Sequence, residues 1–384
     1  MLDTFQSYPF EKLRALLSQS TAPKEKQLFT LTIGEPQFPT PTNIIKAWQD
    51  SAPLLNKYPK SSGEDELKRA QLDFIRARFG LELHLGQIIP TFGTREVLFN
   101  FPQFYLFGKQ TPTIAYPNPF YQIYEGAALA AKARIVLMNL TQKNNFSPLL
   151  SEQELKEVDL VILNSPNNPT GRILDLPSLS EWVQKALEYD FVIINDECYS
   201  EIYEHTKPPS ILEACIHAGN PTFKNILALN SISKRSSAPG LRSGFIAGDE
   251  SILAKYNLYR TYLGCALPLP LQKAATIAWS DMHTPESIRH IYAQNLSLAR
   301  EILSLNKQQL CPYTFYVWLE VGDDEDFCKF AYEKYGVLTL PGSYLGRNSE
   351  GKGFVRIALV YDNDATKKAL LALKDALHHY KSLK

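Results

Sequence analysis

Short, uninterrupted hydrophobic runs recur along the middle of the chain, between Gln110 and Asp249. Turn residues and amphipathic stretches separate them, and the runs read TIAY (113–116), RIVLMNL (134–140), DLVILN (159–164), FVIIN (191–195), NILALN (225–230) and GFIAG (244–248). Runs without alternation are typical of strands covered on both faces, as in a mostly parallel sheet with helices packed outside. The pattern therefore predicts an α/β fold whose sheet is built in this region.

The length of the chain favours two domains. A single hydrophobic core rarely grows beyond about 250–300 residues, and this chain has 384 residues, of which 45% are hydrophobic. We expect a large domain over residues 41–270, which contains the strand-rich region. Residues 1–40 and 271–384, with mixed helix and strand signals, are expected to form a smaller α+β domain.

Composition argues against several classes of partner and site. Forty basic residues balance 40 acidic ones, so no overall field points to nucleic acid or to a membrane surface. The N-terminal stretch MLDTFQSYPFEKLRALL lacks the basic start and apolar core of an export signal, and no run is long enough to span a membrane. The 5 cysteines form no CxxC pair and the histidines show no ligand spacing, which predicts neither disulfides nor a metal site. We expect a cytoplasmic protein with small-molecule partners.

Three of the hydrophobic runs end in clusters of polar residues. NSPNNPTG (164–171) follows DLVIL, DECY (196–199) follows FVIIN, and SISK (231–234) follows NILALN. In open parallel sheets, ligands bind outside the carboxyl ends of the strands, where loops and helix N-termini converge. We therefore expect these three clusters to meet at one crevice.

The residue types at this crevice match the needs of pyridoxal 5'-phosphate. That cofactor requires an amine for its aldehyde, an acid beside its ring nitrogen, donors to its phenolate oxygen, and cations or amides for its phosphate. Lys234 offers the amine and Asp196 offers the acid. Burial and a neighbouring cation would lower the pKa of Lys234, so that its free amine can act as a base.

Two segments are candidates for the phosphate. Arg242, eight positions after Lys234, has a planar guanidinium that can bind phosphate through two hydrogen bonds, and Ser231 supplies a hydroxyl beside it. The GTR segment (93–95) follows the strand-like IIPTF and opens a helical stretch. Backbone N–H groups at such a helix start bind phosphate without a special side chain.

Each of these residues also has an ordinary explanation when taken alone. A lysine after a strand is usually an exposed loop residue, and NNPTG favours a tight turn through local sterics. Tyr121 can be a core aromatic, Tyr58 a surface residue, and Arg356 in FVRIALV can face solvent. The ordered combination of GT, NPTG, DxxY, SxSK and GLRSG favours the cofactor hypothesis over chance.

Together the motifs resemble those of fold-type I pyridoxal-phosphate aminotransferases of the aspartate aminotransferase class. The similarity begins with LTIGEPQFPTP near residue 31 and passes through YPKSSGEDELKRA, NPFYQIYEGAA, NSPNNPTGR, NDECYSEIY and SISKRSSAPGLRSGF to FVRIALV. It covers nearly the whole chain. The resemblance implies the fold-type I architecture, a homodimer, and amino-acid and 2-oxo-acid substrates.

The resemblance assigns cofactor-binding roles to individual residues. Lys234 would form the Schiff base, Asp196 would pair with the pyridinium nitrogen, and Tyr121 would stack on the ring. Asn168 and Tyr199 would hold the phenolate oxygen, so Lys234, Asp196 and Tyr199 are the expected catalytic residues. The phosphate would be bound by Thr94, Arg95, Ser231 and Arg242, with Tyr58 reaching across from the second subunit.

Substrate binding is implied in the same way. Arg356 would bind the α-carboxylate through two hydrogen bonds, assisted by the backbone at Gly34 and the side chain of Asn168. An amino donor would displace Lys234, and the freed lysine would move a proton from the substrate's α-carbon. The resemblance also implies a cis peptide bond between Asn168 and Pro169.

Within this class, the runs NPFYQIYEGAA, SKRSSAPGLRSGFIAGD and YLGCALPLPLQ are most similar to succinyldiaminopimelate transaminases. Those enzymes interconvert N-succinyl-2-amino-6-oxopimelate and N-succinyl-LL-2,6-diaminopimelate, with glutamate and 2-oxoglutarate, in bacterial lysine biosynthesis. Phe120 stands where many relatives carry a glycine and is expected to reshape the pocket. Candidates for reading the distal end of the substrate are Arg235, Lys60 and Arg347.

Other functions share these motifs. An aminotransferase acting on aspartate, aromatic amino acids or methionine would need the same core residues, and a carbon-sulfur lyase could use Lys234 and the ring almost as well. A regulator that binds pyridoxal phosphate is a third alternative. The match begins close to the N-terminus and the net charge is zero, which argues against a DNA-binding module.

Overall fold

A seven-stranded sheet forms the centre of the computed structural model, which describes residues 5–306 and 309–384. The sheet has the order β2-β8-β7-β6-β5-β3-β4. Neighbouring strands from β4 to β7 run parallel, whereas β8 is antiparallel to both β7 and β2. The strands are β2 (Ile88–Thr91), β3 (Thr113–Asn118), β4 (Arg134–Asn139), β5 (Leu160–Asn164), β6 (Val192–Asp196), β7 (Ile226–Ser231) and β8 (Gly244–Gly248). Each predicted run forms a strand, and the α/β fold with a mostly parallel sheet is confirmed.

Helices cover both faces of this sheet, as the continuous hydrophobic runs predict. Every residue of β5, β6, β7 and β8 is buried, and successive residues point to opposite faces. Val161 and Ile193 belong to one hydrophobic cluster, whereas Ile162 and Ile194 belong to another on the opposite face. The first face is covered by α2 (Thr42–Asp50), α3 (Asp65–Phe79), α7 (Leu176–Tyr189), α8 (Ile211–His217) and α11 (Leu269–Ser280), and the second by α4 (Thr94–Tyr105), α5 (Ile123–Ala130) and α10 (Glu250–Arg260).

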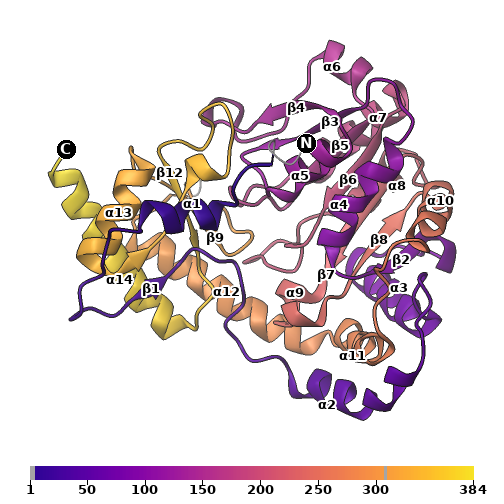
Figure 1. Cartoon of the computed structure of the whole chain (residues 1–384), viewed down its shortest axis with the longest axis horizontal. Coiled ribbons are helices and arrows are strands. Elements are labelled where there is room, and N and C mark those ends of the chain that lie inside the picture. The colour runs from indigo at the N-terminus through magenta and orange to yellow at the C-terminus, as the bar shows by residue number, and fades with distance from the viewer. Residues whose placement is uncertain (1–4, 307–308) are drawn as a thin grey trace.

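A second, smaller sheet lies beside the first (Figure 1). It is antiparallel, with the order β11-β12-β9, and is formed by β9 (Tyr316–Glu320), β11 (Leu340–Pro341) and β12 (Phe354–Ala358). The short strand β1 (Phe29–Thr30) pairs in parallel with β10 (Val337–Leu338). Three long helices accompany these strands, α12 (His283–Ile302), α13 (Asp324–Tyr335) and α14 (Asn363–Ser382). Phe29 and Leu31 pack in one hydrophobic cluster with residues of these helices.

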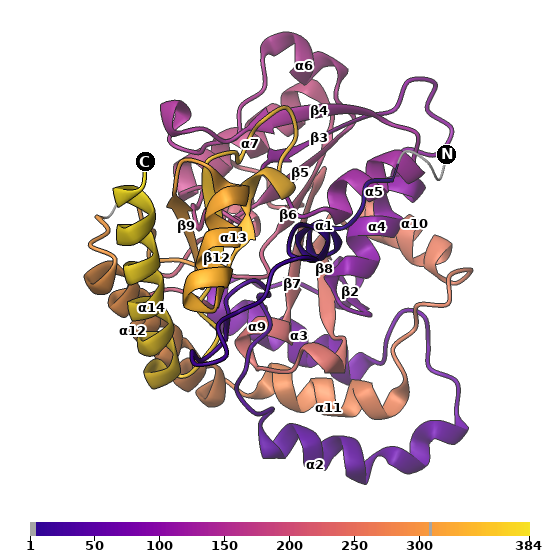
Figure 2. The same cartoon turned by 60° about the vertical axis from the view of Figure 1, so that its left-hand side comes forward.

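The N-terminal helix α1 (Pro9–Leu16) packs on the smaller sheet region, where Leu13 shares a hydrophobic cluster with Trp318 and Leu340, and Figure 2 shows it on the side that faces the large sheet. The remaining short helices are α6 (Glu152–Glu157), α9 (Ile232–Arg235), and the 3-10 turns η2 (Ala52–Asn56), η3 (Leu85–Gln87), η4 (Gln142–Asn144), η5 (Pro239–Leu241) and η6 (Gly342–Tyr344). In the part of the chain described, no helix has both the length and the apolar character needed to cross a membrane.

The packing of α11 bears on the division into domains. Ala274, Ala278 and Trp279 of this helix belong to the hydrophobic cluster on one face of the large sheet. The next helix, α12, contributes Leu296 to the second hydrophobic cluster, the one that contains Phe29 and Leu31. We propose that the large domain, predicted over residues 41–270, extends to the end of α11, with the smaller domain formed by the segments on either side.

Candidate active site

A cavity of about 840 Å³ lies at the carboxyl ends of the parallel strands. The last residues of β5, β6 and β7, which are Asn164, Asp196 and Ser231, all line it. The three polar clusters therefore meet, because parallel strands deliver their carboxyl ends to one edge of the sheet. The predicted site residues that line the cavity are Gly34, Thr94, Arg95, Tyr121, Asn168, Asp196, Tyr199, Ser231, Lys234, Arg242 and Arg356.

Lys234 is carried by α9, a single helical turn that starts directly after β7. The hydroxyl of Ser231 caps this turn by accepting a hydrogen bond from the N–H of Ser233 (3.1 Å). The ammonium of Lys234 donates to the carbonyl oxygen of Gly34. Burial lowers the pKa of Lys234 to about 8, and the charges of Arg356 and Arg242 act in the same direction. Roughly a tenth of this amine is therefore unprotonated and nucleophilic at pH 7, far more than in an exposed lysine.

Asp196 ends β6 as a buried carboxylate. Its oxygens accept hydrogen bonds from the hydroxyl of Tyr124 (2.8 Å) and the N–H of Cys198 (3.2 Å). Burial raises the pKa of Asp196, whereas these hydrogen bonds lower it. The carboxylate forms no ion pair within the described residues, so a cation in the cavity would be a favourable partner for it.

Arg356, on β12, contributes a buried guanidinium from the smaller sheet. Its Nη1 donates to the side-chain oxygen of Asn168 (2.9 Å) and its Nη2 donates to the carbonyl of Thr32 (2.7 Å). The group lies 4.4 Å from the ring centroid of Tyr316. Its Nε is buried and has no hydrogen-bond partner among the described residues. An anion in the cavity would supply the missing acceptor.

The N-terminus of α4 faces the same cavity. Gly93 precedes this helix with φ 73°, and the first N–H groups of a helix, here those of Thr94 and Arg95, have no partner within it. A side chain at position 93 would overlap the guanidinium of Arg242, because a Cβ there would meet its Nη2 atom. Neither Arg95 nor Arg242 forms an ion pair with a carboxylate in the described chain. These features are typical of an anion-binding site.

Comparison with known proteins shows the family. The chain matches the family model "Aminotransferase class I and II" over residues 26–373. It belongs to this family of aminotransferases. An LL-diaminopimelate aminotransferase of Natranaerobius thermophilus is 31% identical over 384 residues, covering 96% of each chain. Two solved structures are also similar: aminotransferase AspB of Helicobacter pylori 26695 (TM-score 0.95, 55% identity, 98% of this chain and 99% of that one) and an aminotransferase of Neisseria meningitidis Z2491 (TM-score 0.92, 38% identity, 99% of both).

Aminotransferases of this family use pyridoxal phosphate, and the cavity of this chain fits that cofactor. It combines a buried amine of lowered pKa, a buried carboxylate without a cationic partner, and a helix N-terminus flanked by arginines. Buried charges without partners are unfavourable unless a ligand of complementary charge is bound. Pyridoxal phosphate offers an aldehyde, a ring cation and a phosphate, which are the complements of these three groups.

Two further predictions concern Tyr58 and the peptide bond between Asn168 and Pro169. Tyr58 does not line the cavity; its side chain is fully exposed beside a separate hollow of about 480 Å³. Because Tyr58 was predicted to act in the site of a second subunit, its role stays a prediction. The peptide bond between Asn168 and Pro169 is cis, which confirms that prediction. Cis bonds at Asn118-Pro119 and Ser165-Pro166 are additional to it.

The three residues named as candidates for reading the distal end of the substrate do not line this chain's own cavity. Arg235 is buried between aromatic rings, Lys60 forms an ion pair with Glu64 (3.3 Å), and Arg347 binds Glu125 (2.7 Å), and none of the three lines the cavity. Phe120 does not line it either. Its ring is 1% exposed and packs on Tyr116, with ring centroids 5.0 Å apart, so it shapes the core rather than the pocket.

Several cavity residues were missed by the sequence analysis. Tyr124 lies in the first turn of α5, three positions after Tyr121, which precedes the helix, so its closeness in sequence to Tyr121 was the signal that could have found it. Tyr316, whose hydroxyl is 3.1 Å from that of Tyr199, lies in a strand with no distinctive motif. Tyr8 also lines the cavity, and no pattern in the N-terminal stretch indicates this.

Proposed function

We propose that this aminotransferase interconverts N-succinyl-2-amino-6-oxopimelate and N-succinyl-LL-2,6-diaminopimelate, with glutamate and 2-oxoglutarate as the other pair. The observation that carries the proposal is that Arg356 on β12 and Arg95 on α4 line one cavity, in addition to Arg242, without carboxylate partners in the described chain. Both glutamate and the succinylated compound carry more than one carboxylate, and arginine binds carboxylates through two parallel hydrogen bonds. The motifs shared with succinyldiaminopimelate transaminases support the same substrate.

We further propose the following roles in cofactor binding. Lys234 holds the aldehyde, Asp196 pairs with the ring nitrogen, and Tyr121 stacks on the ring. Asn168 and Tyr199 donate hydrogen bonds to the phenolate oxygen. The phosphate is bound by the N–H groups of Thr94 and Arg95, the hydroxyl of Ser231 and the guanidinium of Arg242, with Tyr58 contributed by the second subunit of a homodimer. We also propose that the enzyme works in the cytoplasm, where its small substrates are made.

The chain's own residues then divide the work of catalysis. When bound, pyridoxal phosphate supplies an electron sink for the negative charge that forms at the substrate's α-carbon. Arg356, with Asn168 and the backbone at Gly34, orients the α-carboxylate. The Nζ atom of Lys234 takes the proton from the α-carbon, which its lowered pKa of about 8 favours near neutral pH. Asp196 holds a negative charge beside the ring nitrogen throughout.

A second candidate substrate is LL-diaminopimelate without the succinyl group. The relative from Natranaerobius thermophilus, 31% identical, is named for that compound. The two substrates share the diaminopimelate skeleton but differ at the distal nitrogen, which is an ammonium in one and a neutral amide bearing a carboxylate in the other. A cavity rich in arginine favours the succinylated form, because it replaces a positive charge with a negative one.

A half-reaction separates these candidates. Purified holoenzyme is mixed with glutamate while the absorbance of the cofactor is followed, and then N-succinyl-2-amino-6-oxopimelate or oxaloacetate is added. In the reverse direction, N-succinyl-LL-2,6-diaminopimelate and LL-diaminopimelate are compared as amino donors. We expect the succinylated compounds to react fastest and Lys234→Ala to show no reaction. Faster reaction with LL-diaminopimelate, oxaloacetate or an aromatic 2-oxo acid would overturn the substrate, and a wild-type protein without a cofactor band would overturn the role of Lys234.

A further inference from the structure

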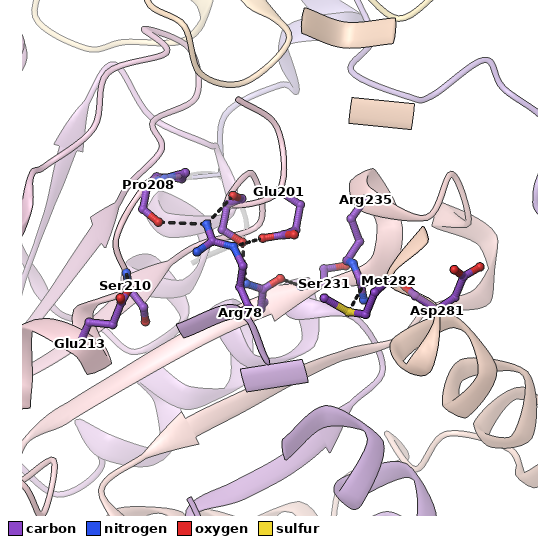
Figure 3. A network of polar contacts seen from close by, with 11 residues as sticks. Arg78, Glu201, Pro208, Ser210, Glu213, Ser231, Arg235, Asp281 and Met282 are labelled. Carbon is purple, nitrogen blue, oxygen red and sulfur yellow. Dashed lines mark hydrogen bonds and ion pairs between the residues drawn. The ribbon is translucent and has the colours of Figure 1, made fainter. Parts of the chain in front are cut away.

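A buried polar cluster lies behind the cavity, between the loop that follows β6 and the helix that follows β7 (Figure 3). Its first element is a hydrogen bond from the side-chain nitrogen of Asn230 to the hydroxyl of Ser200 (2.8 Å). Both side chains are almost fully buried. Ser200 directly follows Tyr199, and Asn230 directly precedes Ser231, which caps the helical turn of Lys234. This bond therefore connects the two segments that carry Tyr199 and Lys234.

Arg78, from the last turn of α3, anchors the first of these segments. Its Nε forms an ion pair with Glu201 (2.6 Å), and its Nη2 donates to the carbonyls of Ser200 (3.1 Å) and Pro208 (3.0 Å). Figure 3 shows the guanidinium between Glu201 and Pro208. One buried group thus binds both ends of the loop from residue 200 to residue 208 and holds it on α3.

Arg235 anchors the second segment. It directly follows Lys234 on α9, and its guanidinium lies 4.6 Å from the ring centroid of Phe74 on α3 and 5.3 Å from that of Trp279 on α11. Its Nη2 donates to the carbonyl of Asp281 (2.9 Å), just beyond the end of α11. Carbonyls at a helix C-terminus lack partners and carry partial negative charge, so a cation is favourable there.

The two anchors share one support. Phe74 and Arg78 are four residues apart on α3 and so lie on the same face of that helix, where Phe74 stacks under Arg235 while Arg78 binds the loop after β6. Glu201, the ion-pair partner of Arg78, also acts electrostatically on Arg235. Burying two guanidiniums is unfavourable for solvation even with Glu201 beside them, and apolar groups of similar size usually stabilise a core as well or better. The guanidiniums provide something that apolar groups cannot: their planar sets of N–H donors fix the positions of the backbone carbonyls that they bind.

We propose that Arg78 and Arg235 are positioning residues, which hold the loop after β6 and the helical turn after β7 on α3 and thereby set the position of Lys234 relative to Tyr199. This inference rests on the proposed roles of Lys234 and Tyr199. Neither arginine lines the cavity, so any effect of changing them on the cofactor acts through the two segments.

The test compares Arg235→Met and Arg235→Lys with Arg289→Met. Arg289 on α12 is a matched control, because it also stacks on a ring, that of Tyr203 at 4.5 Å, and donates to carbonyls of the same loop (3.4 and 3.5 Å) without reaching Ser200 or α9. Four quantities are measured: the affinity for pyridoxal phosphate, the rate of the glutamate half-reaction, the pH titration of the cofactor's absorbance in the holoenzyme, and the melting temperature of the apoprotein.

We expect Arg235→Met to weaken cofactor binding about tenfold or more and to slow the glutamate half-reaction by about 10- to 100-fold, since misplacement of a reacting group by about 1 Å has effects of this size. Its absorbance titration should also move to a different pH. Arg235→Lys should recover part of each change, because it keeps the charge but not the fork of donors. Arg289→Met should lower the melting temperature alone.

Cofactor affinity and absorbance titration that match the wild type in both Arg235 variants would overturn the inference, whatever their melting temperatures. If Arg235→Met does not fold, Ser200→Ala carries the test, because it removes only the hydroxyl that joins the two segments. Unchanged cofactor properties in Ser200→Ala and Arg235→Lys would then overturn it. A wild-type band that is missing, or that persists in Lys234→Ala, would instead overturn the proposed function.

Discussion

Replacing Gly34 with alanine places a methyl group against the ring of Tyr316. The added Cβ would overlap the hydroxyl oxygen of Tyr316, and it would lie 2.7 Å from the Cζ atom of that ring and 2.9 Å from Cε2 of Phe315. Ordinary carbon–carbon contacts are about 3.5–4.0 Å. The φ angle of Gly34 lies outside the left-handed region, so the effect of the substitution comes from this overlap and not from the backbone.

The expected loss of stability follows from that overlap. Overpacking a well-filled site costs about 1–3 kcal/mol. For a chain of 384 residues, an unfolding entropy of roughly 2.1 cal/mol/K per residue converts this to a fall of about 1–4 °C in melting temperature. The overlap should also displace groups of the active site, because the Gly34 carbonyl accepts a hydrogen bond from Lys234 and the Tyr316 hydroxyl lies 3.1 Å from that of Tyr199. We expect the glutamate half-reaction to slow about tenfold.

The assay is thermal unfolding of the apoprotein, paired with single-turnover kinetics of the holoenzyme. Gly264→Ala is the control, because an added Cβ there meets nothing within 4 Å. Tyr316→Phe, introduced together with Gly34→Ala, removes the atom that overlaps most and should recover about 1 kcal/mol relative to the sum of the single changes. The reasoning is refuted if Gly34→Ala melts and reacts like Gly264→Ala, or if the double change shows no coupling.

Three further predictions concern charged groups of the site. In the apoprotein, burial lowers the pKa of the Lys234 amine to about 8, whereas in the unfolded chain it is about 10.4. Below pH 8, Lys234→Met should therefore have a free energy of unfolding up to about 3 kcal/mol above that of the wild type, apart from any pH-independent effect of the substitution. Between these two pKa values the unfolded wild type binds more protons than the folded one, so its stability rises with pH. Denaturant unfolding should show the stability difference between variant and wild type shrinking as the pH rises from 8 to 10.5, and a stability difference that does not vary with pH would contradict this. Arg356→Lys should raise the KM for glutamate about 10- to 100-fold through the loss of a charge-assisted hydrogen bond, and steady-state kinetics with unchanged KM would count against the assignment. Tyr124→Phe removes a hydrogen bond that lowers the pKa of Asp196, so the acidic limb of the pH-rate profile should move to higher pH, and an unmoved or lowered limb would exclude this role.

The strands and the polar clusters at their ends were predictable from the sequence because their causes are local. A strand buried on both faces needs a continuous apolar run. The polar residue that ends the run, Asn164, Asp196 or Ser231, marks where the strand ends. The direction of β8 was not predictable, since a central strand has the same composition whether it runs parallel or antiparallel to its neighbours. The site residues could be placed together only because parallel strands bring their carboxyl ends to one edge.

The destinations of single long side chains could not be predicted. Arg235 and Arg347 were two of the three candidates for reading the distal end of the substrate, because an anionic group there needs a cation or a donor, and spacing in the sequence could not choose among them. Each instead binds groups far away in sequence: Arg235 contacts the rings and carbonyls at α3 and α11, and Arg347 pairs with Glu125 on α5. Such partners depend on tertiary packing, which leaves no periodic signal in the chain.

The pairing of β1 with β10 has a consequence for synthesis of the chain. Phe29 and Thr30 pair with Val337 and Leu338, so the first strand has no partner until nearly the whole polypeptide has been made. At roughly 5–20 residues per second, translation of the intervening segment takes roughly 15–60 s. Leu31, fully buried in the finished protein, lacks its native neighbours during that interval, and apolar surface exposed at this stage is prone to aggregation.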